Sequence, residues 1–417
     1  MAFTYSKYIT CHECDLVVGI PIIPINHRAH CPRCDYTLIA HHSNALDRML
    51  ALILSALVFI GLALYFPFIG IDAQGITHSI TLMETVITLI SDRPESLIIA
   101  TIIFFFILLM PLSYLLSLFY VLVAIKSNRN LPFIKPTLKL LDHFKSWSMA
   151  EIFLISILIS FIKILSLASV SLDISFWAYI VFTLLFLATT LHFDHLFIWQ
   201  YIAQLDKTSN SIQNQATPLS LIESKKINTC YVCATHTYET HCPLCKTPSH
   251  PPSGYNIQTS MALLVTAFLL YIPANLLPVM QTQFLGEITQ STILEGVILL
   301  WQHGSYPIAI IIFIASIMVP TGKLIALAWL CYTTANNKQG NLKNRIKLYR
   351  LTEFIGRWSM VDVFVVAILA ALIDLGSITN IVPDWGILAF AGMVISSMLA
   401  ASYFNPRLIW NQQRVPA

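Results

Sequence analysis

Cysteines arranged in pairs are the residues of this chain with the clearest chemistry. Eight of the nine cysteines fall into two sets, and each set consists of two C-x2-C pairs. The ligand candidates are Cys11, Cys14, Cys31 and Cys34 in the first set and Cys230, Cys233, Cys242 and Cys245 in the second. Two such pairs that converge on one ion form a tetrahedral all-thiolate site, most often for zinc. The spacing therefore predicts two small zinc ribbons that hold one Zn²⁺ ion each.

The role of the metal is open at this point. A closed four-cysteine site has no coordination position for a substrate, which favours a structural ion that folds a short segment. The same pairs also suit a rubredoxin-like iron centre for electron transfer. His30 and His241, each directly before a cysteine, are either alternative ligands, partners of the thiolates or solvent-exposed residues. Cys331 lies outside both sets and is expected to be a small apolar side chain.

The chain repeats itself after 211 residues. The tripeptide W-S-M at 147–149 returns at 358–360, and Pro67 returns as Pro278. Each copy begins with a cysteine set and continues into a long apolar region. The sequence therefore predicts a duplicated module.

The composition indicates a membrane protein. Apolar residues make up 56% of the chain and charged residues only 11%, compared with about 25% charged residues in soluble domains. The apolar runs are continuous, which excludes a β-barrel, and they reach the roughly 20 residues that a spanning helix needs. We expect eight spans, at 48–69, 97–125, 149–171, 174–193, 259–280, 306–332, 360–382 and 385–404. Short links at Asp173 and Asp384 predict two tight helical hairpins.

The predicted fold is an all-α polytopic membrane protein of two tandem parallel repeats, each a zinc ribbon followed by a four-helix bundle. The expected boundaries are ribbon 1 at 1–47, bundle 1 at 48–199, a linker with ribbon 2 at 200–257, bundle 2 at 258–410 and a tail at 411–417. Basic residues dominate the loops after the second and sixth spans. The positive-inside rule therefore places both termini and both ribbons in the cytoplasm, where paired cysteines favour metal over disulfides.

Ionisable side chains within the spans are few, which makes them candidates for a transport path. Lys163 in the third span is equivalent to Asp374 in the seventh. We expect the two to pair between the halves, because an unpaired charge at the bilayer centre costs about 2.5–3.5 kcal/mol. Both a polar gate and a structural ion pair fit this placement.

Three further ionisable residues are candidates for the same path. Glu151 and Asp362 begin the third and seventh spans, where the helix dipole also favours carboxylates, so capping is the alternative to a transport role. Lys323 in the sixth span is expected either to reach the membrane interface or to meet a lipid phosphate inside.

Matched prolines, Pro111 and Pro320, interrupt the second and sixth spans. They are candidate helix kinks that widen a cavity between the halves, although membrane helices also tolerate proline without such a role. The outer loops at 72–96 and 281–305 carry apolar residues at helical spacing. This pattern predicts amphipathic segments on the membrane surface.

Enzymatic motifs are missing from the sequence: there is no G-x-S-x-G, no Walker A motif and no H-E-x-x-H. We therefore expect a protein that is not an enzyme. The net charge of +3 lies in loops that can meet anionic lipid headgroups. No basic and aromatic face accompanies the ribbons, so nucleic-acid binding is not expected.

The tandem ribbons with H-C-P-x-C, the four spans after each, the matched prolines at 67 and 278 and the repeated W-S-M together resemble the paraquat-inducible protein A family. The resemblance covers roughly residues 8–410 and implies a Gram-negative inner-membrane protein with the eight cysteines as metal ligands. It also implies a periplasm-spanning partner built of MCE (mammalian cell entry) domains. Phospholipids would pass to or from that partner's tunnel, in support of envelope integrity.

Two other functions fit the sequence. One is a passive membrane anchor for the MCE partner, and the other is an iron–thiolate redox protein of the membrane. Within the family, the overall length and the form of the ribbons favour the LetA-type branch over the PqiA-type branch.

Overall fold

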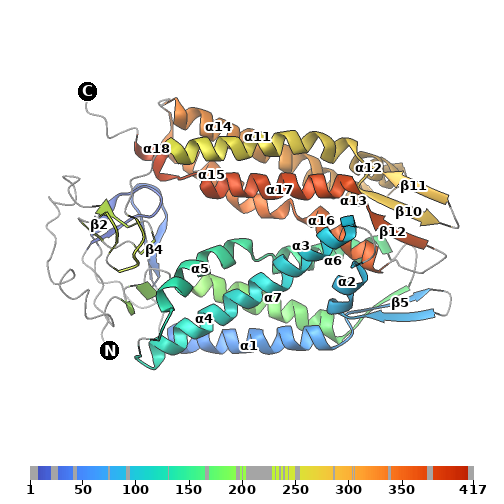
Figure 1. The fold of residues 1–417 in the computed structure, drawn as a ribbon, viewed down its shortest axis with the longest axis horizontal. Helices are drawn as coiled ribbons and strands as arrows, with labels where there is room; N and C mark the ends of the chain where they lie inside the picture. The colour runs from blue at the N-terminus through green and yellow to red at the C-terminus, as the bar shows by residue number, and fades with distance from the viewer. Residues whose placement is uncertain are drawn as a thin grey trace.

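The computed structural model of the chain has two similar halves. It describes residues 8–19, 27–40, 45–73, 76–90, 94–129, 131–164, 169–193, 198–199, 201–202, 228–230, 232–233, 236–237, 240–242, 244–248, 254–284, 287–302, 304, 306–336, 340–372 and 379–411. Within these residues, eight helices are long and apolar enough to cross a membrane, four in each half. The predicted fold class is therefore confirmed. Figure 1 shows the cysteine ribbons at one end of the molecule, here the ribbon end, and β-hairpins at the opposite end, here the sheet end.

The helices and strands follow one another in nearly the same order in the two halves. The first half contains β1 (Tyr8–Thr10), β2 (Val17–Gly19), β3 (Arg28–His30), β4 (Thr37–Ala40), α1 (Ala45–Tyr65), β5 (Ile69–Ala73), β6 (Ile76–Ile80), α2 (Leu82–Thr88), α3 (Pro94–Ile103), the π-helix η1 (Phe104–Leu109), α4 (Met110–Lys126), α5 (Ile134–Trp147), α6 (Ala150–Ile164), β7 (Ser169–Leu172) and α7 (Ile174–His192). The second half contains β8 (Asn228–Thr229), β9 (His236–Thr237), α11 (Gly254–Leu276), β10 (Met280–Phe284), β11 (Glu287–Ser291), α12 (Ile293–Gln302), α13 (Tyr306–Phe313), the π-helix η3 (Ile314–Met318), α14 (Val319–Ala335), α15 (Leu342–Trp358), α16 (Val361–Leu372), β12 (Thr379–Pro383), α17 (Trp385–Tyr403) and α18 (Arg407–Asn411).

The outward faces of the spanning helices are apolar, as a lipid environment requires. Helix α11 exposes Val265, Phe268, Leu269, Ile272 and Leu276. In water such a face would be unfavourable, whereas in a bilayer it contacts hydrocarbon while the helix satisfies its own backbone hydrogen bonds. Each bundle pairs its first and last helices, α1 with α7 and α11 with α17.

Each half carries a three-stranded antiparallel sheet at the sheet end. The strand orders are β6-β5-β7 and β11-β10-β12. Strands β7 and β12 occupy the ends of the spans expected at 149–171 and 360–382, so the prediction of continuous helices there was wrong. The tight helical hairpins were wrong as well, because Asp173 and Asp384 each follow a strand and stand at the N-cap position of the next helix, where Asp384 accepts a hydrogen bond from the Trp385 N–H. Hydropathy alone does not separate the end of a helix from a paired strand.

Short helices follow the hairpins, as the apolar spacing of the outer loops predicted. Helix α2 begins with a capping box in which the Thr81 N–H donates to Glu84 Oε2 (2.8 Å) and the Glu84 N–H donates to Thr81 Oγ1 (3.2 Å). Helix α12 repeats it with Thr292 and Glu295, at 2.8 and 3.3 Å. Each glutamate carboxylate therefore accepts a hydrogen bond from a backbone N–H at the N-terminus of its helix.

A π-helical segment ends two residues before each matched proline. The pattern bonds Met110 N–H to the carbonyl five residues earlier, that of Phe105. Pro111 has no N–H to continue this pattern to the next carbonyl, Phe106 O. That carbonyl instead accepts a hydrogen bond from Met149 N at 3.3 Å. In the first half, Pro111 therefore leaves the Phe106 carbonyl free, and Met149 of the Trp-Ser-Met tripeptide donates to it.

Candidate metal centres and the interface between the halves

Each cysteine set brings four sulfur atoms together. The shortest Sγ–Sγ distances are 3.5 Å in the first ribbon, for Cys11–Cys34 and Cys14–Cys31, and 3.4 Å in the second, for Cys230–Cys245 and Cys233–Cys242. The four ligand atoms of each set lie within 4.8 Å of one another, and all eight residues are buried. A tetrahedral ion with metal–sulfur distances of about 2.3 Å fits such a group. The predicted ligands therefore form two groups able to hold a metal ion.

A shared backbone turn positions the thiols. In the first pair, the Cys11 carbonyl accepts from Asp15 N (3.0 Å) and the Cys11 N–H donates to Leu16 O (2.8 Å). The residue after the second cysteine adopts a left-handed conformation in three of the pairs, with φ of 58° at Asp15, 63° at Asp35 and 58° at Lys246. Aspartate tolerates this conformation better than most residues. The turn keeps the two thiols of a pair close enough to share one ion.

The chemistry of the donor set also fits a cation. Hydrogen bonding with the Cys11 thiol lowers the pKa of Cys34 to about 2, and contact with the same thiol raises the pKa of Cys14. Four ionised thiols this close together would repel one another, and a bound cation would compensate their charge. His30 and His241 are exposed and belong to neither ligand group.

The first ribbon packs against the second bundle. Its four cysteines share a buried cluster with residues of α14, α15 and α18, among them Cys331, Ile346 and Trp410. The Arg33 guanidinium lies over the Trp410 ring, 4.8 Å from its centroid. Cys331 is thus a buried apolar residue beneath the ribbon cluster, as expected.

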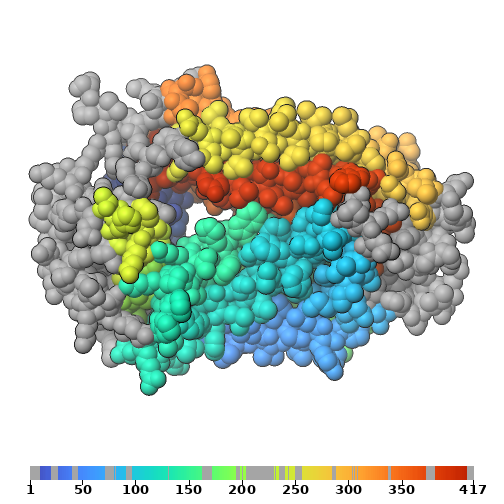
Figure 2. All heavy atoms as spheres, in the orientation of Figure 1, coloured from blue at the N-terminus to red at the C-terminus, as the bar shows by residue number. Residues whose placement is uncertain are grey.

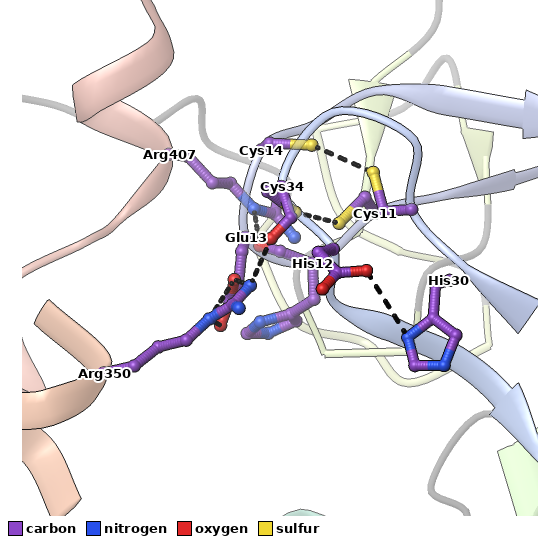
Figure 3. A network of polar contacts seen from close by, with 10 residues as sticks. Cys11, His12, Glu13, Cys14, His30, Cys34, Arg350 and Arg407 are labelled. Carbon is purple, nitrogen blue, oxygen red and sulfur yellow. Dashed lines mark hydrogen bonds and ion pairs between the residues drawn. The ribbon is translucent and has the colours of Figure 1, made fainter. Parts of the chain in front are cut away.

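Two arginines of the second bundle reach the first ribbon (Figure 3). Arg350 of α15 donates through Nε to both carboxylate oxygens of Glu13, at 3.1 and 3.0 Å, and through Nη2 to the carbonyl of Cys34 at 2.8 Å. Arg407 of α18 donates through Nε to the carbonyl of His12 at 2.7 Å. Burial raises the pKa of Glu13, and the hydrogen bond from Arg350 opposes this shift.

The second ribbon packs against the first bundle instead. Its cysteines and Leu244 belong to a large buried cluster that contains Ile198 and Trp199 and continues into the second bundle, and Val232 packs against it. Figure 2 shows this ribbon, in yellow-green, against the helices of the first half. Trp199 and Trp410 are equivalent in the repeat. Each half therefore supplies a ribbon to the bundle of the other half.

The bundles meet mainly through α6 and α16, and α2 and α3 also contact the second bundle. Ser156 Oγ donates to Val361 O at 3.2 Å, and Ser160 Oγ donates to Val365 O at 3.4 Å. At the ribbon side of this pair, Arg357 Nη1 lies 3.7 Å from Glu151 Oε1 across the interface. Figure 2 also shows an opening between α17 and the first bundle near the ribbon end.

Comparison with known proteins identifies the family. The family model described as paraquat-inducible protein A matches residues 46–203 and 257–414, which are the two membrane bundles. The chain belongs to the paraquat-inducible protein A family. No solved structure matches it.

Relatives match along nearly the whole chain. The intermembrane transport protein PqiA of Escherichia coli K12 is 37% identical over 98% of this chain and 96% of its own length. A probable intermembrane transport protein of Haemophilus influenzae is 28% identical, over 97% of this chain and 96% of its own. The lipophilic envelope-spanning tunnel protein A of E. coli K12 is 27% identical, over 97% and 92%. The higher identity to PqiA does not support the expected LetA-type branch.

Only one residue of the predicted Lys163–Asp374 charge pair lies within the described residues. Asp374 is outside the described residues. Lys163 lies in α6, whose described residues run from Ala150 to Ile164. Glu151 and Asp362 occupy the first turns of α6 and α16, as expected. Glu151 also forms the ion pair with Arg357, which ties its first turn to the other half.

Lys323 lies buried among the helices of the second bundle. Its side chain is 3% exposed, and Nζ donates to Ser397 Oγ of α17 at 2.9 Å. Gly356 of α15 provides the space for the Lys323 side chain, because a Cβ at this position would lie 2.6 Å from the Lys323 Nζ. The first half has Lys145 at the position of Gly356 and Tyr114 at that of Lys323. The two halves therefore differ at both positions of this contact.

Sequence reasoning missed the residues that join the parts. Ser156 and Ser160 are small polar residues one helical turn apart in an apolar helix, a pattern typical of contacts between membrane helices. Arg350 and Arg407 gave no comparable signal. Lys139 and Leu196 occupy the equivalent positions of the first half, but differences between the repeats are too many to single out these two.

Proposed function

We propose that this protein is the inner-membrane subunit of a lipid transport system and exchanges phospholipids with a periplasm-spanning MCE-domain partner, in support of envelope integrity. The observation that carries the proposal is the interface between the two four-helix units, whose main helix pair, α6 and α16, places serine hydroxyls on an apolar background. If the two bundles separate along this interface, they expose serine hydroxyls beside apolar side chains. A phospholipid, with a polar headgroup and apolar tails, suits a surface of that kind.

The relatives support a transport role. Two of them are named as intermembrane transport proteins and a third as a lipophilic envelope-spanning tunnel protein. An enzymatic step is not part of this proposal.

The interface contains a small apolar pocket, which sets a condition on the path. Its lining includes Phe153 and Ile157 of α6 and Ile368 of α16, and its free volume is about 10 Å³, room for about one water molecule. Pockets for drug-sized ligands commonly measure about 300–1,000 Å³. Passage of a phospholipid would therefore require α6 and α16 to move apart.

The proposed orientation places the ribbon end in the cytoplasm and the sheet end in the periplasm. The basic loops flank the ribbon end, as the positive-inside rule requires. The two sheets then face the periplasm, where an MCE partner would dock. In a reducing cytoplasm, Zn²⁺ in each ribbon would be the structural ion that the closed thiolate groups suit.

Photocrosslinking tests the path. A photoreactive residue would replace Ile157 or Ile368 in the protein bound to its MCE partner in native membranes, and crosslinked lipids would be identified by mass spectrometry. Phe268 on the lipid-facing side of α11 is the matched control, because it contacts bulk lipid in any case. We expect phospholipid crosslinks at the interface positions that decrease when the partner is deleted.

Crosslinks at the Phe268 position alone, with the partner complex intact, would contradict a path between the bundles. That result would favour a passive anchor. Metal analysis of the purified protein addresses the redox alternative, because iron with visible thiolate absorbance would contradict zinc.

A further inference from the structure

The two ribbons are attached to their bundles by different chemistry. The first ribbon receives Arg350 and Arg407, whereas the second presents Val232 at the position of Glu13 and packs into an apolar cluster. Lys139 and Leu196 replace the two arginines in the first half. The first ribbon is therefore attached by hydrogen bonds from two arginines that the equivalent positions of the first half do not carry.

The acceptors of these arginines exist only when the first ribbon is folded. Arg350 binds the carbonyl of Cys34 in the second C-x2-C pair, and Arg407 binds the carbonyl of His12 in the first pair. Both turns must be in place at once for the two contacts to form. The strands of this ribbon have only three or four residues, so the ribbon depends on a metal ion for its fold.

We propose that Arg350 and Arg407 are positioning residues that couple metal binding by the first ribbon to its attachment to α15 and α18. Metal binding at the second ribbon is independent of such a clamp. Because the coupling is an equilibrium property, it acts in both directions: the arginines raise the metal affinity of the first ribbon, and the metal holds α15 in place. Helix α15 leads through Ser359 and Met360 into α16, the interface helix.

The proposal rests on metal binding by the ribbons and not on lipid transport. Full-length protein loaded with zinc in detergent would be treated with excess EDTA and N-ethylmaleimide, and the alkylation rate of each cysteine peptide would be followed by mass spectrometry. Thiols that ligate zinc react slowly, so the rate reports metal release from each ribbon separately. The second ribbon is an internal control in every sample.

In the Arg350→Ala and Arg407→Ala proteins we expect alkylation of the first-ribbon cysteines to be at least about tenfold faster, because each loses hydrogen bonds from a charged group. Second-ribbon rates should not change. Glu13→Gln should act in the same direction with a smaller effect, and Arg350→Lys should restore part of the loss. Lys139→Ala, at the equivalent position in the first half, should change neither ribbon.

If the alanine variants do not yield monodisperse protein, Glu13→Gln and Arg350→Lys carry the comparison. Unchanged first-ribbon rates, or equal acceleration of both ribbons, would overturn the clamp while leaving metal binding intact. Absence of metal from the wild-type ribbons would instead refute the proposed metal sites. As a second measurement, EDTA should increase hydrogen exchange in α15 more than in its counterpart α5, and equal increases would also contradict the clamp.

Discussion

Phe153 of α6 and Phe364 of α16 occupy equivalent positions in the two halves and meet edge to face across the interface. Their ring centroids are 6.1 Å apart and the ring planes make an angle of 83°. Equivalent residues can contact each other in this way only close to a pseudo-symmetry axis. The axis of the duplicated module therefore passes between these rings, and residues beside it act in both halves at once.

The contact between these rings should be measurable as a coupling energy. Edge-to-face aromatic pairs contribute about 0.5–1.5 kcal/mol beyond burial. We expect Phe153→Leu and Phe364→Leu to be non-additive by that amount in denaturant unfolding in detergent. Phe268→Leu on the lipid-facing side of α11 should be additive with either. Additivity of the first pair would show that the rings contribute nothing as a pair.

Gly356 should be intolerant of a side chain because of Lys323. A methyl group at Gly356 would meet Lys323 Nζ and break its hydrogen bond to Ser397. We expect Gly356→Ala to destabilise the protein by about 1–3 kcal/mol, the cost of leaving a buried polar group unsatisfied, as measured by unfolding in detergent. The additional substitution Lys323→Met should recover much of the loss. A double variant no more stable than Gly356→Ala would contradict this packing.

The capping box of α12 should make its N-terminus sensitive to acid. Hydrogen bonds from the Thr292 backbone and side chain lower the pKa of Glu295. The stabilisation is therefore complete above the unfolded-state pKa of about 4.3 and is lost as the pH falls through the lower folded-state value. We expect amide protection in the first turn of α12, corrected for intrinsic exchange, to decrease between pH 7 and about pH 3.

Glu295→Gln is the matched control for the capping box, because glutamine keeps the hydrogen bond without a charge to titrate. Its protection should not depend on pH over the same range. An equal loss of protection in both proteins would assign the acid sensitivity to another group.

Each ribbon should bind one metal ion independently of the other's ligands. We expect elemental analysis to find two zinc ions per wild-type chain and one in a Cys242→Ser protein, because a site with three thiolates binds zinc more weakly. Cys331→Ser, outside both ligand groups, is the control and should retain two. Two ions in the Cys242→Ser protein would contradict that cysteine's role as a ligand.

The cysteine sets, the repeat and the eight spans could be predicted because each depends on local residue type and spacing. The sheet end could not, since Ser169–Leu172 and Thr379–Pro383 are apolar enough to extend a span and become strands only by pairing with β5 and β10. The capping residues Glu84 and Glu295 carried a readable signal, a threonine three residues earlier. The attachment of Glu13 to Arg350 joins residues 337 positions apart, and no local pattern indicates such a contact.

The exchange of ribbons between the halves has a consequence for how such a chain could be divided. A single module of one ribbon and one bundle leaves its ribbon without a docking surface and its bundle without a cover. Two copies of that module can satisfy both needs only if the ribbon of each copy docks on the bundle of the other. Fusion of the copies into one polypeptide keeps the same contacts and fixes their ratio at one to one. It also allows the two ribbon–bundle contacts to differ in sequence. Arg350 and Arg407, which hold only the first ribbon, are such a difference.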